Sequence, residues 1–417
     1  MNTADAPFSR NTPPSAVKPC EAPCAAKKGL DDQLSTATQK RMEALTGQPV
    51  QSTGSEPGDG GPMLYSADSS PCQKRAYELG PTLRRFNRYR EALPYAYAAN
   101  DMANAKKKRK FGKPLVAPQP PADSCMQRLS SDPDELCAQL GLLKGTLSEE
   151  DLRDDDTGFL AAVYRDQATG KAILVTNDTD PQSLVDWKTN LENGDGRETD
   201  QYTAASSLAT KLKMNGLDYD IAGYSKGGGM AQLMGLQNDK AHVVVFNSAG
   251  LPENFANADQ LAALSARTKS YSAEGDLLTY MNDTRDPAKL VKNAEFLKQE
   301  LMGEGAGVNP MEVSYRNPKN PAGDDDSAFA DARKDLAALM DRQIEAVKKD
   351  GKPPPPVRAA HKEVVRDSAY WYAMGSTDDK PSLGKQIQHL MSHVLDPMKN
   401  NVDRDRQALN RFLERCG

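Results

Sequence analysis

The residues with the clearest chemical potential lie in the stretch 217–237, which reads L-D-Y-D-I-A-G-Y-S-K-G-G-G-M-A-Q-L-M-G-L-Q. A G-x-S-x-G match spans residues 223–227, with Ser225 at its centre. A seryl hydroxyl can attack a carbonyl carbon once a neighbouring base removes its proton, so this residue type suits acyl transfer. The match alone is a weak signal, because Gly and Ser are common residues. The alternative interpretation is a glycine-rich strand-to-helix turn that binds phosphate.

The sequence on either side of Ser225 favours the first interpretation. Apolar residues before the serine suit a short strand, namely Leu217, Tyr219, Ile221 and Ala222. Apolar residues after it recur at helical spacing, namely Met230, Leu233, Met234 and Leu236. A strand, a tight turn at serine and a helix form a nucleophile elbow. Gly223 and Gly227 would let the strand and the helix pass close to a serine held in a strained turn.

The segments around the elbow predict an α/β fold. Strands are expected at residues 159–164, 172–176, 242–246 and 268–272, and a helix is expected at 201–214. The turn at 166–170 makes the first two strands a predicted hairpin. Strands that alternate with helices indicate a mostly parallel sheet. The predicted fold class is therefore α/β, with a mostly parallel sheet flanked by helices.

The candidate acid of a catalytic triad is Asp276. It follows the second strand after the serine, in a loop with Gly275, and such loops at the carboxyl ends of parallel strands are where active sites assemble. Other carboxylates nearby remain alternatives: Glu274, Asp283 and Asp286. The competing interpretation of Asp276 is an aspartate that only stabilises a turn.

The candidate base comes from only four histidines. In the order serine, acid, histidine, His242 lies on the wrong side of the acid and is expected to be structural. His361 is expected to start a helix, and His389 and His393 lie one helical turn apart after a loop-like segment. We prefer His389, then His393, then His361. The H-x-x-x-H spacing does not indicate zinc, because Leu390 replaces the glutamate of that motif; no metal and no cofactor are predicted.

Two backbone N–H groups are needed to stabilise the oxyanion of an acyl-transfer reaction. The first is expected from Lys226, directly after the serine. The second is expected from the turn after strand 172–176, at Asn177 to Thr179, where the side chain of Asn177 or Thr179 could also stabilise the loop.

From Gly158 to about Asp276 the order of these motifs resembles the class 3 lipase branch of the α/β-hydrolases. The matching pieces are A-I-L-V-T-N-D-T (172–179), D-W (186–187), G-Y-S-K-G-G (223–228), F-N-S-A-G (246–250) and S-A-E-G-D (272–276). The resemblance implies that Asp276 is the acid. The segment H-L-M-S-H-V-L-D-P-M (389–398) is similar to the helix that carries the base in bacterial lipase-like effectors, which favours His389 over His393.

The rest of the chain is polar. The 417 residues allow two or three domains, and 38% hydrophobic residues with 27% charged residues indicate some solvated segments. We predict a partly disordered, partly helical N-terminal region at 1–121, with the basic cluster Lys106–Lys110 and a Pro-rich linker. We predict a lipase-like domain at 122–417, with a polar helical insertion at about 285–375. Cys20 and Cys24, or Cys125 and Cys137, could form disulfides, although free thiols are equally allowed.

These features predict a serine esterase, most directly a lipase or phospholipase that acts on membrane glycerolipids. The net charge of −5 does not suggest nucleic-acid binding. Residues 1–28 show no Sec-type signal. A lipase-like core with a polar leader resembles effectors of bacterial type VI or type III secretion. That resemblance implies a bacterial cytoplasmic origin, delivery into a target cell or periplasm, membrane-surface contact, and a secretion apparatus or immunity protein as partner. The alternative is a non-catalytic interaction protein on a hydrolase scaffold.

Overall fold

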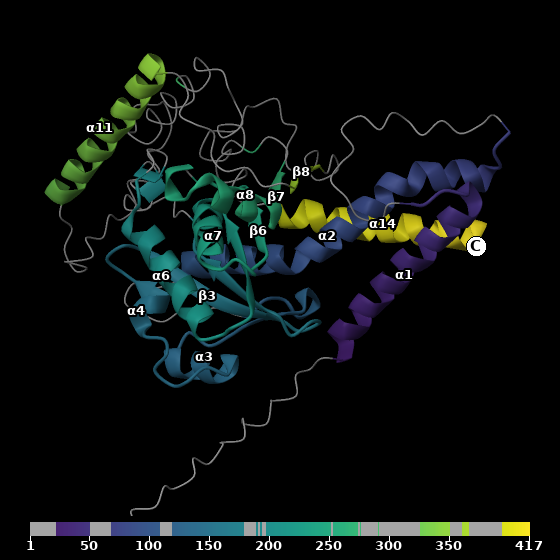
Figure 1. The fold of residues 1–417 in the computed structure, drawn as a ribbon, viewed down its shortest axis with the longest axis horizontal. Helices are drawn as coiled ribbons and strands as arrows, with labels where there is room; N and C mark the ends of the chain where they lie inside the picture. Colours follow the sequence, from purple (N-terminus) through teal and green to yellow (C-terminus); the bar gives the residue numbers. More distant parts are fainter. Residues whose placement is uncertain are drawn as a thin grey trace, which may run out of the picture.

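The strands form one mixed sheet in the computed structural model, which describes residues 22–50, 68–108, 119–178, 189–190, 192–193, 197–251, 253–273, 276, 291, 326–350, 361–366 and 394–417. Its order is β1-β3-β4-β5-β6-β7-β8, and β2 pairs with β3 off this path (Figure 1). The strands are β1 (Met126–Arg128), β2 (Arg153–Asp154), β3 (Phe159–Asp166), β4 (Ala172–Thr176), β5 (Tyr219–Tyr224), β6 (Val243–Phe246), β7 (Thr268–Ala273) and β8 (His361–Val365).

The sheet is antiparallel at one edge and parallel elsewhere. β1 and β4 both run antiparallel to β3, so the predicted hairpin of residues 159–176 is confirmed. From β4 to β8 every neighbouring pair is parallel. The carboxyl ends of β4 to β8 therefore share one edge of the sheet, and their amino ends share the opposite edge. The mostly parallel, helix-flanked sheet predicted from the sequence is confirmed.

One face of the sheet is covered by the helices that connect the parallel strands. These are α6 (Asp200–Met214), α7 (Lys226–Gln237) and α8 (Ala258–Ala266), together with the short helices α3 (Pro133–Leu140) and α4 (Glu149–Leu152). Their buried side chains form one core with alternate residues of the strands, such as Ile221 and Val245. Ala222 and Phe246, one position further along, face the other core. This period of two is the expected signature of a strand buried on both faces.

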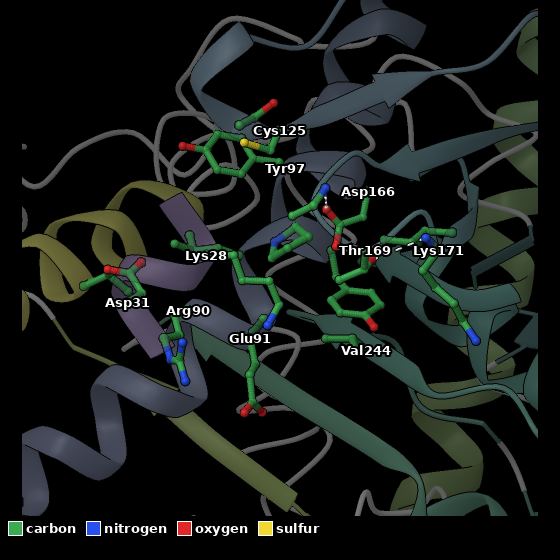
Figure 2. Close-up of a pocket in the computed structure, with 18 of the residues that line it drawn as sticks. Lys28, Asp31, Arg90, Glu91, Tyr97, Cys125, Asp166, Thr169, Lys171 and Val244 are labelled. Atoms are coloured by element: carbon green, nitrogen blue, oxygen red, sulfur yellow. Dashed lines mark hydrogen bonds between the residues drawn. The ribbon is translucent and has the colours of Figure 1, made fainter. Parts of the chain in front are cut away.

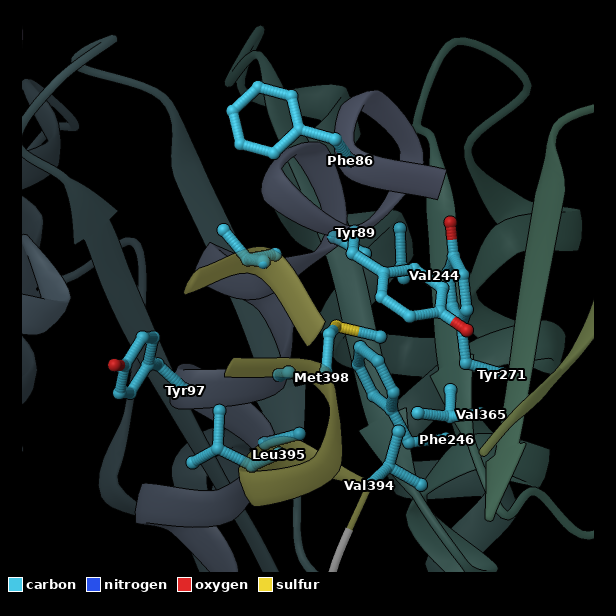
Figure 3. Close-up of a cluster of buried hydrophobic side chains, with 14 of the residues drawn as sticks. Phe86, Tyr89, Tyr97, Val244, Phe246, Tyr271, Val365, Val394, Leu395 and Met398 are labelled. Carbon is cyan, nitrogen blue, oxygen red and sulfur yellow. The ribbon is translucent and has the colours of Figure 1, made fainter. Parts of the chain in front are cut away.

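The second face is covered by helices from the two ends of the chain. α2 (Pro71–Lys108) packs on the sheet, α14 (Leu395–Cys416) packs along α2, and α1 (Ala22–Thr46) packs against both helices. In Figure 3, Tyr89 of α2 lies beside Tyr271 of the sheet, and Met398 of α14 lies beside Phe246. The Tyr89 and Tyr271 rings meet edge to face, with centroids 6.1 Å apart.

The packing on this second face joins residues from both sides of the domain boundary expected between residues 121 and 122. Within the region expected to be partly helical, α1 has 25 residues and α2 has 38. The buried residues of α2 belong to the same core as β4 to β8, so the N-terminal helices and the sheet share one core. The basic cluster begins in the last turn of α2, at Lys106–Lys108, and its remainder lies outside the described residues.

The predicted polar insertion at about 285–375 is only partly helical in the described residues. Helix α11 (Asp326–Asp350) lies within this predicted insertion. The helix expected from His361 is wrong, because residues 361–365 form β8, an additional parallel strand beside β7. The side chain of Val365 is fully buried in the core with α2 and α14, which explains why this short segment joins the sheet.

Two disulfides tie the helices of the second face together. Cys24 of α1 bonds to Cys125, just before β1, and Cys72 at the start of α2 bonds to Cys416 at the end of α14. Of the possibilities that the sequence left open, neither Cys125–Cys137 nor Cys20–Cys24 is formed, and Cys137 is a buried free thiol. The 3-10 turns η1 (Ala122–Ser124) and η2 (Glu253–Phe255) complete the described elements.

Bidentate ion pairs add to this second face. Arg88 of α2 donates to both carboxylate oxygens of Glu363 in β8, at 2.7 and 3.0 Å, and both side chains are buried. Arg85 makes the same type of contact with Asp405 of α14, at 2.8 and 2.6 Å. These arginines of α2 thus pair with carboxylates from distant parts of the chain. The apolar side of α2 is buried in the core, and its arginine side is covered as well.

Candidate active site

The backbone at Ser225 has the conformation of a nucleophile elbow. β5 ends at Tyr224, α7 begins at Lys226, and Ser225 stands between them with φ 54° and ψ −123°. Such a conformation is strained for a residue with a side chain and costs on the order of 1–3 kcal/mol. Backbone hydrogen bonds hold it: the Ser225 N–H donates to Phe246 O at 3.0 Å, and the Ser225 carbonyl accepts from Gly228 and Ala249 at 3.0 and 2.9 Å.

The glycines of the motif are required by space. A Cβ at Gly223 would lie 2.1 Å from the Gly227 carbonyl oxygen, and a Cβ at Gly227 would lie 2.7 Å from the Thr176 carbonyl oxygen. Gly228 is equally constrained, since a Cβ there would lie 2.3 Å from Ser248 Oγ. The strand, the helix and the turn after β4 therefore touch backbone to backbone around Ser225, which is the packing that the sequence predicted for residues 223 and 227.

The amino end of α7 lies against the turn after β4, where the oxyanion donors are expected. Lys226 is the first residue of α7 and is buried. Its N–H belongs to the positive end of the helix dipole, which favours a developing negative charge. Thr176 Oγ1 donates to Gly227 O at 3.3 Å, so the end of β4 and the start of α7 are directly linked.

Asn177 stabilises this turn rather than an oxyanion. Its N–H donates to Leu160 O at 2.9 Å, and its Oδ1 accepts from Leu160 N at 2.9 Å. Its Nδ2 donates to Gly158 O at 3.1 Å and to Asp178 O at 3.2 Å. The Asn177 N–H, which was expected as an oxyanion donor, is thus bonded to β3. Its side chain stabilises the loop through the three hydrogen bonds just described. Thr179, the other expected donor, lies outside the described residues.

Asp276 lies at the same edge of the sheet as Ser225. β7 ends at Ala273, and the Asp276 N–H donates to the Ala273 carbonyl at 3.1 Å in a tight turn. The residue is buried, with 5% of its surface exposed, and so is Ser225, at 7%. The alternatives Glu274, Asp283 and Asp286 lie outside the described residues.

Two of the four histidines lie in the described residues, and both are at the amino edge of the sheet. His242 directly precedes β6, and His361 is the first residue of β8, paired in register with Lys269 near the start of β7. Both backbones therefore lie at the amino edge, opposite to Ser225. Four residues of strand separate His361 from the carboxyl edge, or about 13 Å. The position of its backbone does not favour His361 as the base. His389 and His393 lie outside the described residues.

Comparison with known protein families agrees with this geometry. A family described as phospholipase-like, with a Tle-like phospholipase domain, matches residues 102–314, which is half of the chain. The chain belongs to this family. It is a bacterial phospholipase effector-like family, and membership implies a lipid substrate. No curated protein matches the chain.

The matched part of this phospholipase-like chain contains a further polar cluster that the sequence analysis did not identify. The loop after β6, residues 247–249, contacts both the elbow and the end of β7. Gln232 of α7 fixes it by donating to Ser248 Oγ at 3.0 Å and to Ala249 O at 2.9 Å. The motif F-N-S-A-G was visible in the sequence, but only the fold shows which neighbours its side chains reach.

One cavity among the described residues lies away from this site. It has a volume of about 580 Å³ and opens at the amino edge of the sheet, where Lys171, Asp220 and His242 line it together with residues of α1 and α2 (Figure 2). Its charged groups pair with one another, as in the contact of Lys28 with Asp32 and that of Lys269 with Glu91. The cavity and Ser225 are therefore at opposite ends of the parallel strands.

Metal sites and membrane-spanning helices were sought among the described residues. Among them, no three or more His, Cys, Asp or Glu side chains gather in a way that could bind a metal ion. None of the helices in the described ranges is both long and apolar enough to cross a membrane.

Proposed function

We propose that this chain is a serine phospholipase or lipase that hydrolyses carboxylic-ester bonds of membrane glycerolipids through an acyl-enzyme on Ser225. The observation that carries the proposal is the strained backbone of Ser225 at a strand-to-helix junction, with Asp276 buried at the same edge of the sheet. A fold maintains a strained serine at such a place when the strain aims the hydroxyl at a substrate. Membership in the phospholipase-like family supports the lipid ester as substrate.

The proposed mechanism has two acyl-transfer steps. In the first, the imidazole of His389 takes the proton of Ser225 Oγ as this oxygen attacks the ester carbonyl carbon. The tetrahedral oxyanion accepts hydrogen bonds from the Lys226 N–H and from a second donor, for which we propose Thr179. Collapse breaks the ester bond, and the imidazolium gives its proton to the departing alcohol. Water then attacks the acyl-enzyme with the same base, which releases the fatty acid and restores Ser225.

We propose His389 as the base and His393 as the second candidate, with Asp276 orienting the imidazole. His242 and His361 lie at the amino edge of the sheet, which supports a base from the later part of the chain. Val394, the first described residue after that segment, is buried in the same cluster as Phe246 and Val365, the last residues of β6 and β8 (Figure 3). The chain thus passes close to the catalytic edge directly after His393.

We further propose that the protein acts in an oxidising compartment, such as the periplasm of a target cell, after delivery by a secretion apparatus. Disulfides persist in such compartments and are rare in the cytosol, and this fold contains two of them. The Lys106–Lys110 cluster could contact anionic headgroups, with about 1 kcal/mol of attraction for each cation near the surface. An immunity protein that binds the phospholipase would be the expected partner in the producing cell.

The experiment that tests the proposed function is a panel of defined lipids, incubated with the wild-type protein and with Ser225→Ala. The proposal predicts release of fatty acid from at least one class of glycerolipid, and a loss on the order of 10⁶-fold in the variant. Circular dichroism would confirm that both proteins are folded. Equal hydrolysis by both proteins would overturn the role of Ser225. Hydrolysis by neither, in folded protein, would favour a non-catalytic scaffold.

A further inference from the structure

Asn247 stands out because it is a buried residue with a strained backbone that no step of the proposed mechanism uses. It directly follows β6, between the strand that leads to Ser225 and the strand that leads to Asp276. Its φ is +42°, and only 2% of its surface is exposed. Left-handed backbone is uncommon for residues other than glycine, although Asn tolerates it better than most. The fold therefore keeps a side chain where glycine would be the less strained residue.

The side-chain amide of Asn247 joins the two neighbouring strands. Its Oδ1 accepts a hydrogen bond from the Ala273 N–H at 2.8 Å, and its Nδ2 donates to Tyr224 Oη at 3.3 Å. Its own N–H donates to Tyr271 O at 2.9 Å, which continues the ladder between β6 and β7. Glycine could preserve the backbone contact but neither of the side-chain contacts.

These bonds lead directly to both candidate catalytic residues. Ala273, which Asn247 holds, accepts the N–H of Asp276 at 3.1 Å, so two hydrogen bonds connect the amide with the acid turn. Two residues after Asn247, the Ala249 N–H donates to the Ser225 carbonyl at 2.9 Å. The loop that begins at Asn247 therefore fixes the acid turn on one side and the serine turn on the other.

We propose that Asn247 is a positioning residue, whose amide holds the end of β7, and with it Asp276, at a fixed place relative to Ser225. This inference rests on the proposed function, because it assigns the geometry of the same triad. The bond to Ala273 matters most, since it is the shorter one and belongs to the strand that carries the acid. A shift of about 1 Å at a reacting group can lower a rate about 10²-fold, so two well-placed hydrogen bonds can decide the activity.

The test compares Asn247→Gly and Asn247→Asp with the wild-type protein on a soluble fluorogenic ester. Glycine keeps the left-handed backbone and removes the amide, whereas aspartate keeps the oxygen that accepts from Ala273. Asn238→Gly is the matched control, because Asn238 is buried at the far end of α7 and its Oδ1 accepts from Lys240 N at 3.2 Å. Rates are expressed per site that reacts with a fluorophosphonate, so that loss of folded protein does not count as loss of activity.

We expect Asn247→Gly to lower kcat about 10- to 100-fold while KM stays within twofold. The acid limb of its pH profile should move to lower pH, because an imidazole that loses a well-placed carboxylate protonates less readily. Asn247→Asp should regain most of kcat without that downward movement, and Asn238→Gly should keep the wild-type kcat and lose only stability.

Wild-type kcat per reactive site in Asn247→Gly would overturn the positioning role, as would equal losses in Asn247→Gly and Asn238→Gly. Wild-type activity in Ser225→Ala, measured beside these variants, would instead overturn the proposed function and this inference with it. The two failures are therefore distinguishable in one set of measurements.

Discussion

Replacing the elbow glycines with alanine should lower activity in the order set by their contacts. An alanine Cβ at Gly223 would lie 2.1 Å from the Gly227 carbonyl oxygen, about 1.3 Å short of the 3.4 Å at which ordinary contact begins. At Gly227 the nearest atoms are the carbonyl oxygens of Thr176 and Asn177, at 2.7 and 2.8 Å, so the deficit is about 0.7 Å. All of these neighbours are backbone atoms, which cannot rotate away.

The magnitude follows from these displacements. Overpacking of this kind costs about 1–3 kcal/mol of unfolding free energy. Gly227 lies inside α7, where alanine would by itself be favoured over glycine by about 1 kcal/mol, so a net destabilisation would mean that the clash outweighs helix propensity. A movement near 1 Å at a reacting group costs about 10²-fold in rate. We therefore expect losses of kcat/KM of about 10²-fold or more for Gly223→Ala, and of about 10-fold to 10²-fold for Gly227→Ala.

The assay measures fluorogenic-ester hydrolysis together with urea unfolding. Gly29→Ala in α1 is the matched control, because no atom lies within 4 Å of its added Cβ, and this variant should be as stable as the wild type or slightly more stable. If Gly223→Ala fails to fold, Gly227→Ala still tests the geometry. Wild-type kcat/KM in a folded Gly227→Ala or Gly223→Ala would refute the claim that backbone contacts set the position of the serine.

Three further predictions concern the scaffold. Replacing Cys72 and Cys416 with serine should lower the unfolding free energy by about 2–4 kcal/mol, and a reductant in thermal unfolding should then have less effect than on the wild type. Arg88→Met should cost about 3–5 kcal/mol, because it leaves Glu363 buried without its bidentate partner; replacing both residues should cost less than the sum of the single changes. Burial acts to raise the pKa of Asp151, but hydrogen bonds from Lys211 and Ser148 outweigh it, so the pKa is lowered. The stability from Asp151 is therefore present above about pH 4 and is lost as the pH falls through the lowered pKa, and Asp151→Asn should flatten this acid loss in unfolding titrations.

The elbow could be predicted from the sequence because its determinants are local. Gly223, Ser225 and Gly227 lie within five residues, and the strand and helix patterns on either side are contiguous with them. The position of Asp276 at the same edge followed from the rule that parallel strands place their carboxyl ends together. Both predictions needed only the order of the elements.

The second face of the sheet could not be predicted because its partners are far apart in the chain. The arginines of α2 suggest an exposed helix until Glu363 and Asp405 are placed beside Arg88 and Arg85. The segment H-K-E-V-V at 361–365 is too short to distinguish a strand from a helix by its pattern. The disulfide partners could not be predicted for the same reason, since a bond between residues 344 positions apart leaves no local signal.

Covalent labelling of Ser225 tests the central claim most directly. The wild-type protein would be treated with a fluorophosphonate, and its intact mass, the modified peptide and the remaining esterase activity would be followed together. Our account predicts one adduct per chain, located at Ser225, with activity lost in proportion to labelling and no adduct in folded Ser225→Ala. Full activity in completely labelled protein, or activity that disappears while Ser225 stays unmodified, would contradict it.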